Sequence, residues 1–212
     1  MCASGERLVC MAVVATLFLA GAGSALAQGR PYFGVSLGQS KFKSEPGACS
    51  DWNGILDPGY ACSGDDKDSA WKIYAGYGFN RYIAAEVGYA RLGEQRETAS
   101  GTLALYPESV RRERRVWALA GTLVGSLVIT RSFGLTARLG LAYWNEKIST
   151  SSSGLAGSRT SDGVSPAYGI GLIFGLNRDT CIRFERERFS DLGDKAHAGD
   201  VDLVSVGIAH RY

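Results

Sequence analysis

The stretch from Trp71 to Tyr89, WKIYAGYGFNRYIAAEVGY, decides the fold of this chain. Its bulky apolar residues, such as Ile73, alternate with glycine, small or polar residues, and a period of two sends the two sets to opposite faces of a β-strand. Asn80-Arg81 interrupts the alternation, which predicts a hairpin turn between one strand at 70–79 and the next at 82–92. The stretch therefore predicts an antiparallel hairpin with one apolar face.

The rest of the chain repeats this alternation, and with the hairpin it predicts eight antiparallel strands. The further strands are expected at 32–41, 115–129, 134–144, 167–176, 180–189 and 201–212. Short turns at 80–81, 130–133 and 177–179 alternate with long loops at 42–69, 93–114, 145–166 and 190–200. An even number of strands with short turns at one end and long loops at the other is typical of an outer-membrane barrel, with both termini on the periplasmic side.

A soluble eight-stranded barrel of the lipocalin type has the same alternation, so the polar face must decide between the two. That face carries charges that suit a polar lumen better than an apolar core: Lys72, Glu86, Arg138, Arg183, Glu185 and Glu187. Aromatic residues near strand ends on the other face suit the two membrane interfaces: Trp71, Tyr77, Tyr89 and Tyr143. The sequence predicts an all-β, eight-stranded antiparallel up-and-down transmembrane β-barrel.

The N-terminus reads as a targeting segment. Arg7 precedes an apolar run that ends near Ala22, and Ala25-Leu26-Ala27 is a small-residue cleavage site, which predicts a signal peptide at 1–27. The run is shorter than the ~20 residues of a spanning helix, so an uncleaved anchor is the weaker alternative. Residues 28–212 are then expected to form one outer-membrane β-barrel domain.

Cysteine usage fits an exported protein. Cys49 and Cys62 lie 13 residues apart in a Gly, Asp, Pro and Ser-rich stretch, which favours a disulfide that stabilises the loop by ~3 kcal/mol. Metal binding is the rival reading, but the spacing matches no zinc pattern. Cys181 has no obvious partner. No cofactor or metal site is predicted, and a formal charge of +2 gives no reason to expect a nucleic-acid partner.

Three motifs resemble corresponding strands of OmpA-like transmembrane barrels: 71–82 with 86–89, 139–144, and 183–189. The resemblance implies a Gram-negative outer-membrane location among lipid and lipopolysaccharide, and an internal salt-bridge network made by the lumen charges. It also implies a C-terminal signal for the barrel insertion machinery, formed by Val204, Val206, Ile208, His210 and Tyr212, although His210 departs from the usual apolar residue. Some members carry a peptidoglycan-binding domain, and here the resemblance ends with the barrel, so no cell-wall tether is implied.

Function is expected to be a structural or surface-interaction role, with an unidentified surface ligand possible for the exposed loops. A narrow or gated channel is the alternative, because eight strands leave too little room for a porin-like lumen, which needs ~16 strands. A lipid A-modifying enzyme is weaker: Ser190, Asp191 and His197 could supply a nucleophile and base, but they are ordinary loop residues, so no catalytic residue is predicted. The basic run 111–115 could contact lipopolysaccharide phosphates or be a plain solvated cluster.

Overall fold

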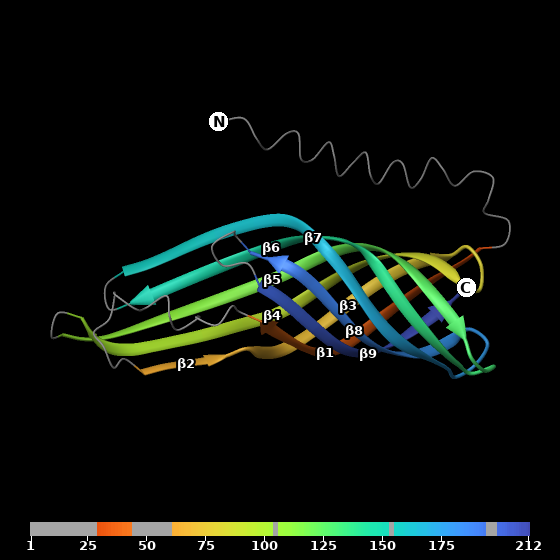
Figure 1. The fold of residues 1–212 in the computed structure, drawn as a ribbon, viewed down its shortest axis with the longest axis horizontal. Helices are drawn as coiled ribbons and strands as arrows, with labels where there is room; N and C mark the ends of the chain where they lie inside the picture. The colour runs from red at the N-terminus through yellow and green to blue at the C-terminus, as the bar shows by residue number, and fades with distance from the viewer. Residues whose placement is uncertain (1–28, 44–60, 104–105, 153–154, 194–198) are drawn as a thin grey trace, which may run out of the picture.

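A computed structural model describes residues 29–43, 61–103, 106–152, 155–193 and 199–212 (Figure 1). Within these ranges the chain forms nine β-strands. They are β1 (Arg30–Lys43), β2 (Ala61–Asp65), β3 (Lys67–Gly78), β4 (Ile83–Leu103), β5 (Tyr106–Val128), β6 (Phe133–Ser152), β7 (Leu155–Gly175), β8 (Thr180–Leu192) and β9 (Gly199–Arg211). A search of the described residues for an apolar helix long enough to cross a membrane finds none.

Eight of these strands close into an antiparallel barrel, as the sequence predicts. The hydrogen-bonded order runs β4-β3-β1-β9-β8-β7-β6-β5, and pairing of β4 with β5 closes the ring. The chain thus winds up and down around the barrel, and its two end strands, β1 and β9, lie side by side (Figure 1). The short β2 pairs only with β4, between Arg96 and Ser100, so it lies outside the ring.

The two faces of the barrel follow the predicted alternation. Large apolar side chains such as Val87, Leu123 and Leu139 are exposed on the outer face, where a membrane barrel meets lipid. The segment 115–129 carries apolar residues on both faces, and the structure points Leu119 and Leu123 outward and Ala118 inward. The interior therefore holds the charges and the small residues.

The prediction of long loops at 93–114 and 145–166 is mostly wrong, because β-strands run through both segments. β4 and β5 stay paired out to Leu103 and Tyr106, and β6 and β7 stay paired from Phe133–Phe174 to Ser152–Leu155. Beyond Glu146 the β6–β7 extension is exposed or half-exposed on both faces, and the buried inner face of the β4–β5 extension includes polar residues such as Gln95 and Glu97, so neither segment shows the apolar alternation that would mark a strand. The strands project far beyond the barrel on the side of the predicted extracellular loops (Figure 1).

Gly140 and Gly121 give a direct test of how closely β5 and β6 approach. A Cβ added at Gly140 would collide with the backbone of Gly121 and Thr122, whereas a Cβ at Gly121 meets no atom within 4 Å. We expect Gly140→Ala to destabilise the barrel by about 1–3 kcal/mol in urea unfolding from lipid vesicles, as overpacking does. Gly121→Ala is the matched control and should unfold like the unaltered protein; equal destabilisation by both changes would contradict the close approach.

Candidate functional site

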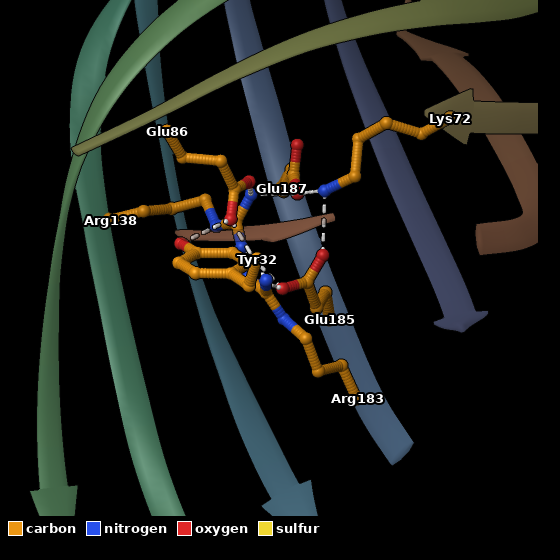
Figure 2. A network of polar contacts seen from close by, with 7 residues as sticks. All are labelled: Tyr32, Lys72, Glu86, Arg138, Arg183, Glu185 and Glu187. Carbon is orange, nitrogen blue, oxygen red and sulfur yellow. Dashed lines mark hydrogen bonds and ion pairs between the residues drawn. The ribbon is translucent and has the colours of Figure 1, made fainter. Parts of the chain in front are cut away.

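Six charged side chains from four strands meet inside the barrel (Figure 2). Lys72 comes from β3, Glu86 from β4, Arg138 from β6, and three more from β8: Arg183, Glu185 and Glu187. Alternation points all six inward, and all six are buried. These are the residues that the sequence assigned to the lumen, and we call them the ionic network.

Glu86 and Arg138 lie at the centre of this network. Arg138 Nη1 lies 2.9 Å from Glu86 Oε1 and 2.6 Å from Glu187 Oε1, and Arg138 also pairs with Glu185. Glu86 Oε2 accepts a hydrogen bond of 2.8 Å from Arg183 Nη1 and one of 3.1 Å from the Tyr32 hydroxyl. Each carboxylate is therefore shared by more than one cation.

Lys72 joins the network through β8. Its Nζ lies 2.6 Å from Glu185 Oε2 and also pairs with Glu187. The three cations and three carboxylates balance, so the network carries no formal net charge. A neutral, fully paired set is the arrangement in which buried charges cost least free energy.

A layer of buried apolar residues lies beyond the ionic network on the extracellular side. On β8, Phe189 follows Glu187, and on β9, Val201 and Leu203 precede Ser205 in the same inward-facing series. The layer is completed by Leu192, also on β8, and by inward residues of other strands: Phe42, Leu92, Val116 and Trp144. We call this the apolar layer, and it crosses the lumen where side chains of eight strands fill the interior.

A third level of the lumen, which is polar, lies beyond the apolar layer on the extracellular side. Arg114 pairs with Glu146 inside the barrel, and Arg114 Nη2 donates a 2.9 Å hydrogen bond to the carbonyl of Leu192. Farther out, Gln95 donates a 2.9 Å hydrogen bond to Glu97. The lumen is thus stacked as ionic network, apolar layer and outer polar level.

The extracellular extensions form a sheet with unequal edges. On one side β2 pairs with β4, so that edge is covered between Arg96 and Ser100. On the other side β7 pairs with β8 only from Ala167 to Gly175, and residues 155–166 have a strand neighbour on one side only among the described residues. We call residues 155–166 the open edge.

The basic run 111–115 does not lie on one face. Arg111 and Arg115 point outward, whereas Arg112 and Arg114 point to the inner side, so the run is not a continuous basic surface. Burial raises the pKa of Glu94, but hydrogen bonding by Arg115 and Glu113 and the positive charges of Arg115 and Arg96 together outweigh it, so the pKa of that carboxyl is lowered. The outer arginines therefore have carboxylate partners.

An arc of aromatic rings marks the extracellular membrane interface on β3 to β6. The ring centroids of Trp71 and Tyr89 lie 5.5 Å apart, those of Tyr89 and Trp117 5.7 Å, and those of Trp117 and Tyr143 5.8 Å. Outward-facing aromatic rings at the end of an apolar band are typical of the headgroup level. The extended sheet begins directly beyond this arc.

The remaining predicted site residues are spread along the chain. Cys62 lies in β2 and Cys49 falls outside the described residues, so their disulfide stays a prediction. His197 also falls outside the described residues, while the Ser190 hydroxyl lies 3.5 Å from that of Tyr168. Among the described residues, no group of His, Cys, Asp and Glu has the arrangement of a metal site.

The C-terminal residues alternate along β9. Val204, Val206 and Ile208 point outward, and the His210 ring contacts the ring of Tyr212 with centroids 5.2 Å apart. His210 Nδ1 lies 3.0 Å from the Thr180 hydroxyl. The outward series has the pattern expected of an insertion signal, whose role stays a prediction.

Comparison with known proteins gives matches by sequence. A family model described as the outer membrane protein beta-barrel domain matches residues 10–211. Outer membrane protein A of Klebsiella aerogenes is 28% identical over 144 residues, covering 66% of this chain and 37% of that protein. Outer membrane protein A of Serratia marcescens is 29% identical over 146 residues, covering 66% and 38%. The chain spans less than half the length of these relatives.

Solved structures match in fold. Ail, the attachment invasion locus protein of Yersinia pestis, in complex with the heparin analogue sucrose octasulfate, has a TM-score of 0.50 at 18% identity, covering 86% of this chain and 99% of that chain. The outer membrane protein OprG from Pseudomonas aeruginosa has a TM-score of 0.50 at 13% identity, covering 85% and 95%. At these identities the likeness shows the barrel fold alone.

Proposed function

This chain belongs to the outer membrane protein beta-barrel family. We propose that it is a surface-interaction barrel whose extended extracellular sheet binds other proteins. The observation that carries this proposal is the open edge of β7 at residues 155–166. The barrel anchors the sheet in the outer membrane, and the sheet presents its edge beyond the headgroups.

The chemistry of the open edge suits an extended peptide segment. The outer edge of a sheet offers a row of backbone N–H and C=O groups, and a partner that adds one strand there gains main-chain hydrogen bonds. Ser158 and Thr160 on this edge are exposed, and Pro166 at its base donates no backbone hydrogen bond, so addition would be confined to residues beyond it. The predicted ligand is therefore an extracellular protein segment in β conformation.

A peptide with the sequence of residues 143–152 tests the edge, because this segment of β6 already forms an antiparallel strand against residues 155–164 on the opposite side of β7. We expect saturable binding of the labelled peptide to the protein in lipid nanodiscs, measured by fluorescence anisotropy. Replacing residues 147–160 with Asn-Gly joins the paired residues Glu146 and Ser161 through a two-residue turn. This truncation should weaken binding by about tenfold or more, since the outer half of the open edge is lost.

A matched truncation of the neighbouring hairpin is the control. Replacing residues 98–111 with Asn-Gly joins the paired residues Glu97 and Arg112, removes the same length of strand and leaves the open edge in place. Binding should persist in this control and disappear for a peptide N-methylated on alternate residues. Equal loss in both truncations, or equal binding of the N-methylated peptide, would refute strand addition.

We place a narrow or gated channel second. Opening would require rearrangement of the ionic network, whose buried charges are neutral as a set and would each lose partners. The apolar layer is a second barrier in series with the first, which supports a structural role for the network.

We also propose that the protein is not an enzyme. The matched relatives are outer membrane proteins A, and in the described part of the chain the Ser190 hydroxyl has a tyrosine hydroxyl, and not a base, as its neighbour. We further propose that the protein follows the usual export route. Residues 1–27 would be removed as a signal peptide, a Cys49–Cys62 disulfide would form after export, and the outward series on β9 ending in Tyr212 would be read by the insertion machinery.

A further inference from the structure

The outer wall at β8 is apolar over a shorter height than the wall at β7. A strand tilted by about 40° rises about 2.5 Å per residue, so the outward residues of β7 from Phe174 to Val164 span about 25 Å of apolar height. On β8 the outward apolar series ends at Arg186, only six residues after Thr180. Arg186 thus lies about 15 Å above the start of β8. Arg186 therefore lies below the top of the apolar band.

The neighbours of Arg186 confirm this depth. In register it pairs with Ile170 on β7 and Val204 on β9, whose side chains are both more than half exposed on the outer wall. Arg186 itself is 61% exposed. An arginine at this position faces the lipid, where an unpaired charge is unfavourable.

Arg186 is part of a cluster built on one shielded carboxylate. Asp202 Oδ2 lies 3.1 Å from Arg186 Nη2 and 3.2 Å from Lys43 Nζ, and Asp202 Oδ1 accepts a 2.6 Å hydrogen bond from Arg188 Nε. The Asp202 side chain is only 8% exposed because the cations cover it. We call these four residues the Asp202 cluster, and its formal charge is +2.

The charge of the Asp202 cluster stays positive when its surroundings are included. Asp200 Oδ2 lies 3.7 Å from Arg188 Nη1, which leaves three cations against two carboxylates. Arg186 donates to Asp202 through one Nη, and a guanidinium has five N–H donors in a planar fork, so donors remain for a ligand on the outer wall. That fork matches the oxygens of a phosphate group.

We propose that the Asp202 cluster binds a phosphate of the lipid A headgroup in the outer leaflet. The cluster lies on the lipid-facing wall at the height where the apolar band of β8 ends, and an anionic headgroup there neutralises cations that lipid cannot solvate. Asp202 holds the three cations together, and the half-exposed ring of Tyr168, in register with Arg188, borders the site. The lipid is therefore held beside β8 and β9, just below the base of the open edge.

Nanodiscs of defined lipid test the site with the whole protein. Nanodiscs that contain bisphosphorylated lipid A should raise the midpoint temperature of heat-modifiable gel migration by several degrees over discs that contain dephosphorylated lipid A with the same acyl chains. Arg186→Gln with Arg188→Gln should abolish most of this difference and lower lipid A retention by about tenfold, measured by native mass spectrometry. The double variant Arg131→Gln with Arg178→Gln, which removes two exposed charges from periplasmic turns, should behave like the unaltered protein.

Folding and binding are kept apart by two further variants. Adding Asp202→Asn to the glutamine pair removes the carboxylate that would be left without its arginines, so this triple variant should fold and still fail to retain lipid A. Arg186→Lys with Arg188→Lys keeps the charge and should retain lipid A more weakly, because the planar fork is lost. The proposal is overturned if the unaltered protein does not distinguish the two lipids, if the glutamine variants respond like the periplasmic control, or if inorganic phosphate in detergent raises the midpoint equally.

Discussion

Glu86→Gln is expected to lower the free energy of unfolding by about 3–5 kcal/mol, the usual cost of removing one partner from a buried ion pair. Glu86 accepts hydrogen bonds from Arg138, Arg183 and Tyr32, so the change leaves two guanidinium groups with fewer acceptors. It also leaves the ionic network with a net charge of +1 in the lumen. Urea unfolding from lipid vesicles measures the loss.

A second variant that restores the neutrality of the ionic network separates the effect of its net charge from the effect of losing single contacts. Lys72 pairs with Glu185 and Glu187. Glu86→Gln combined with Lys72→Met leaves two cations and two carboxylates, and we expect the double variant to be less destabilised than the sum of its two single variants. Glu113→Gln, at a partly exposed carboxylate of the extracellular sheet, is the control and should change stability by less than about 1 kcal/mol. Strict additivity of the two interior changes would show that neutrality is not what stabilises the network.

Single-channel conductance of the Glu86→Gln variant tests the gated-channel alternative. The apolar layer remains intact in this variant, so single-channel recordings in planar bilayers should stay at the level of the unaltered protein. A clear rise in conductance would favour the gated channel, because it would mean that the ionic network alone closes the lumen.

The barrel itself could be predicted from the sequence because lipid and lumen impose opposite chemistry on alternate residues. Ile73 and Val87 meet lipid while Lys72 and Glu86 meet the lumen, so the period of two appears in the sequence. The same alternation placed all six members of the ionic network on the inner face. Which cation pairs with which carboxylate depends on strand register and barrel closure, and the sequence alone does not determine these.

Three features could not be predicted from the sequence, because they depend on how strands pair or on segments that lie outside the membrane. The ends of β6 and β7 meet water on both faces, so Ser149 to Ser152 carry no alternation. Two members of the apolar layer, Phe42 and Leu192, fell in predicted loops. The Asp202 cluster joins residues of β1, β8 and β9, and only the register brings them together.

Phe189→Ala is expected to have the other large effect, a loss of about 3–5 kcal/mol on unfolding. The Phe189 side chain is 1% exposed and belongs to the apolar layer, so truncation leaves a cavity that the surrounding strands cannot close. Phe184→Ala on the same strand is the matched control, because Phe184 is 50% exposed on the lipid-facing wall. Urea unfolding should show a much smaller loss for Phe184→Ala than for Phe189→Ala.

The same variant tests which barrier closes the lumen. If the ionic network and the apolar layer block ions in series, Phe189→Ala alone should leave conductance at baseline, and only its combination with Glu86→Gln should raise it. A rise in conductance with Phe189→Ala alone would make the apolar layer the sole barrier. Unchanged conductance even in the combined variant would mean that other side chains in the eight-stranded lumen, such as Arg114 and Glu146, are enough to seal it. The series arrangement therefore predicts one specific outcome among three, and planar-bilayer recordings of the three variants distinguish them.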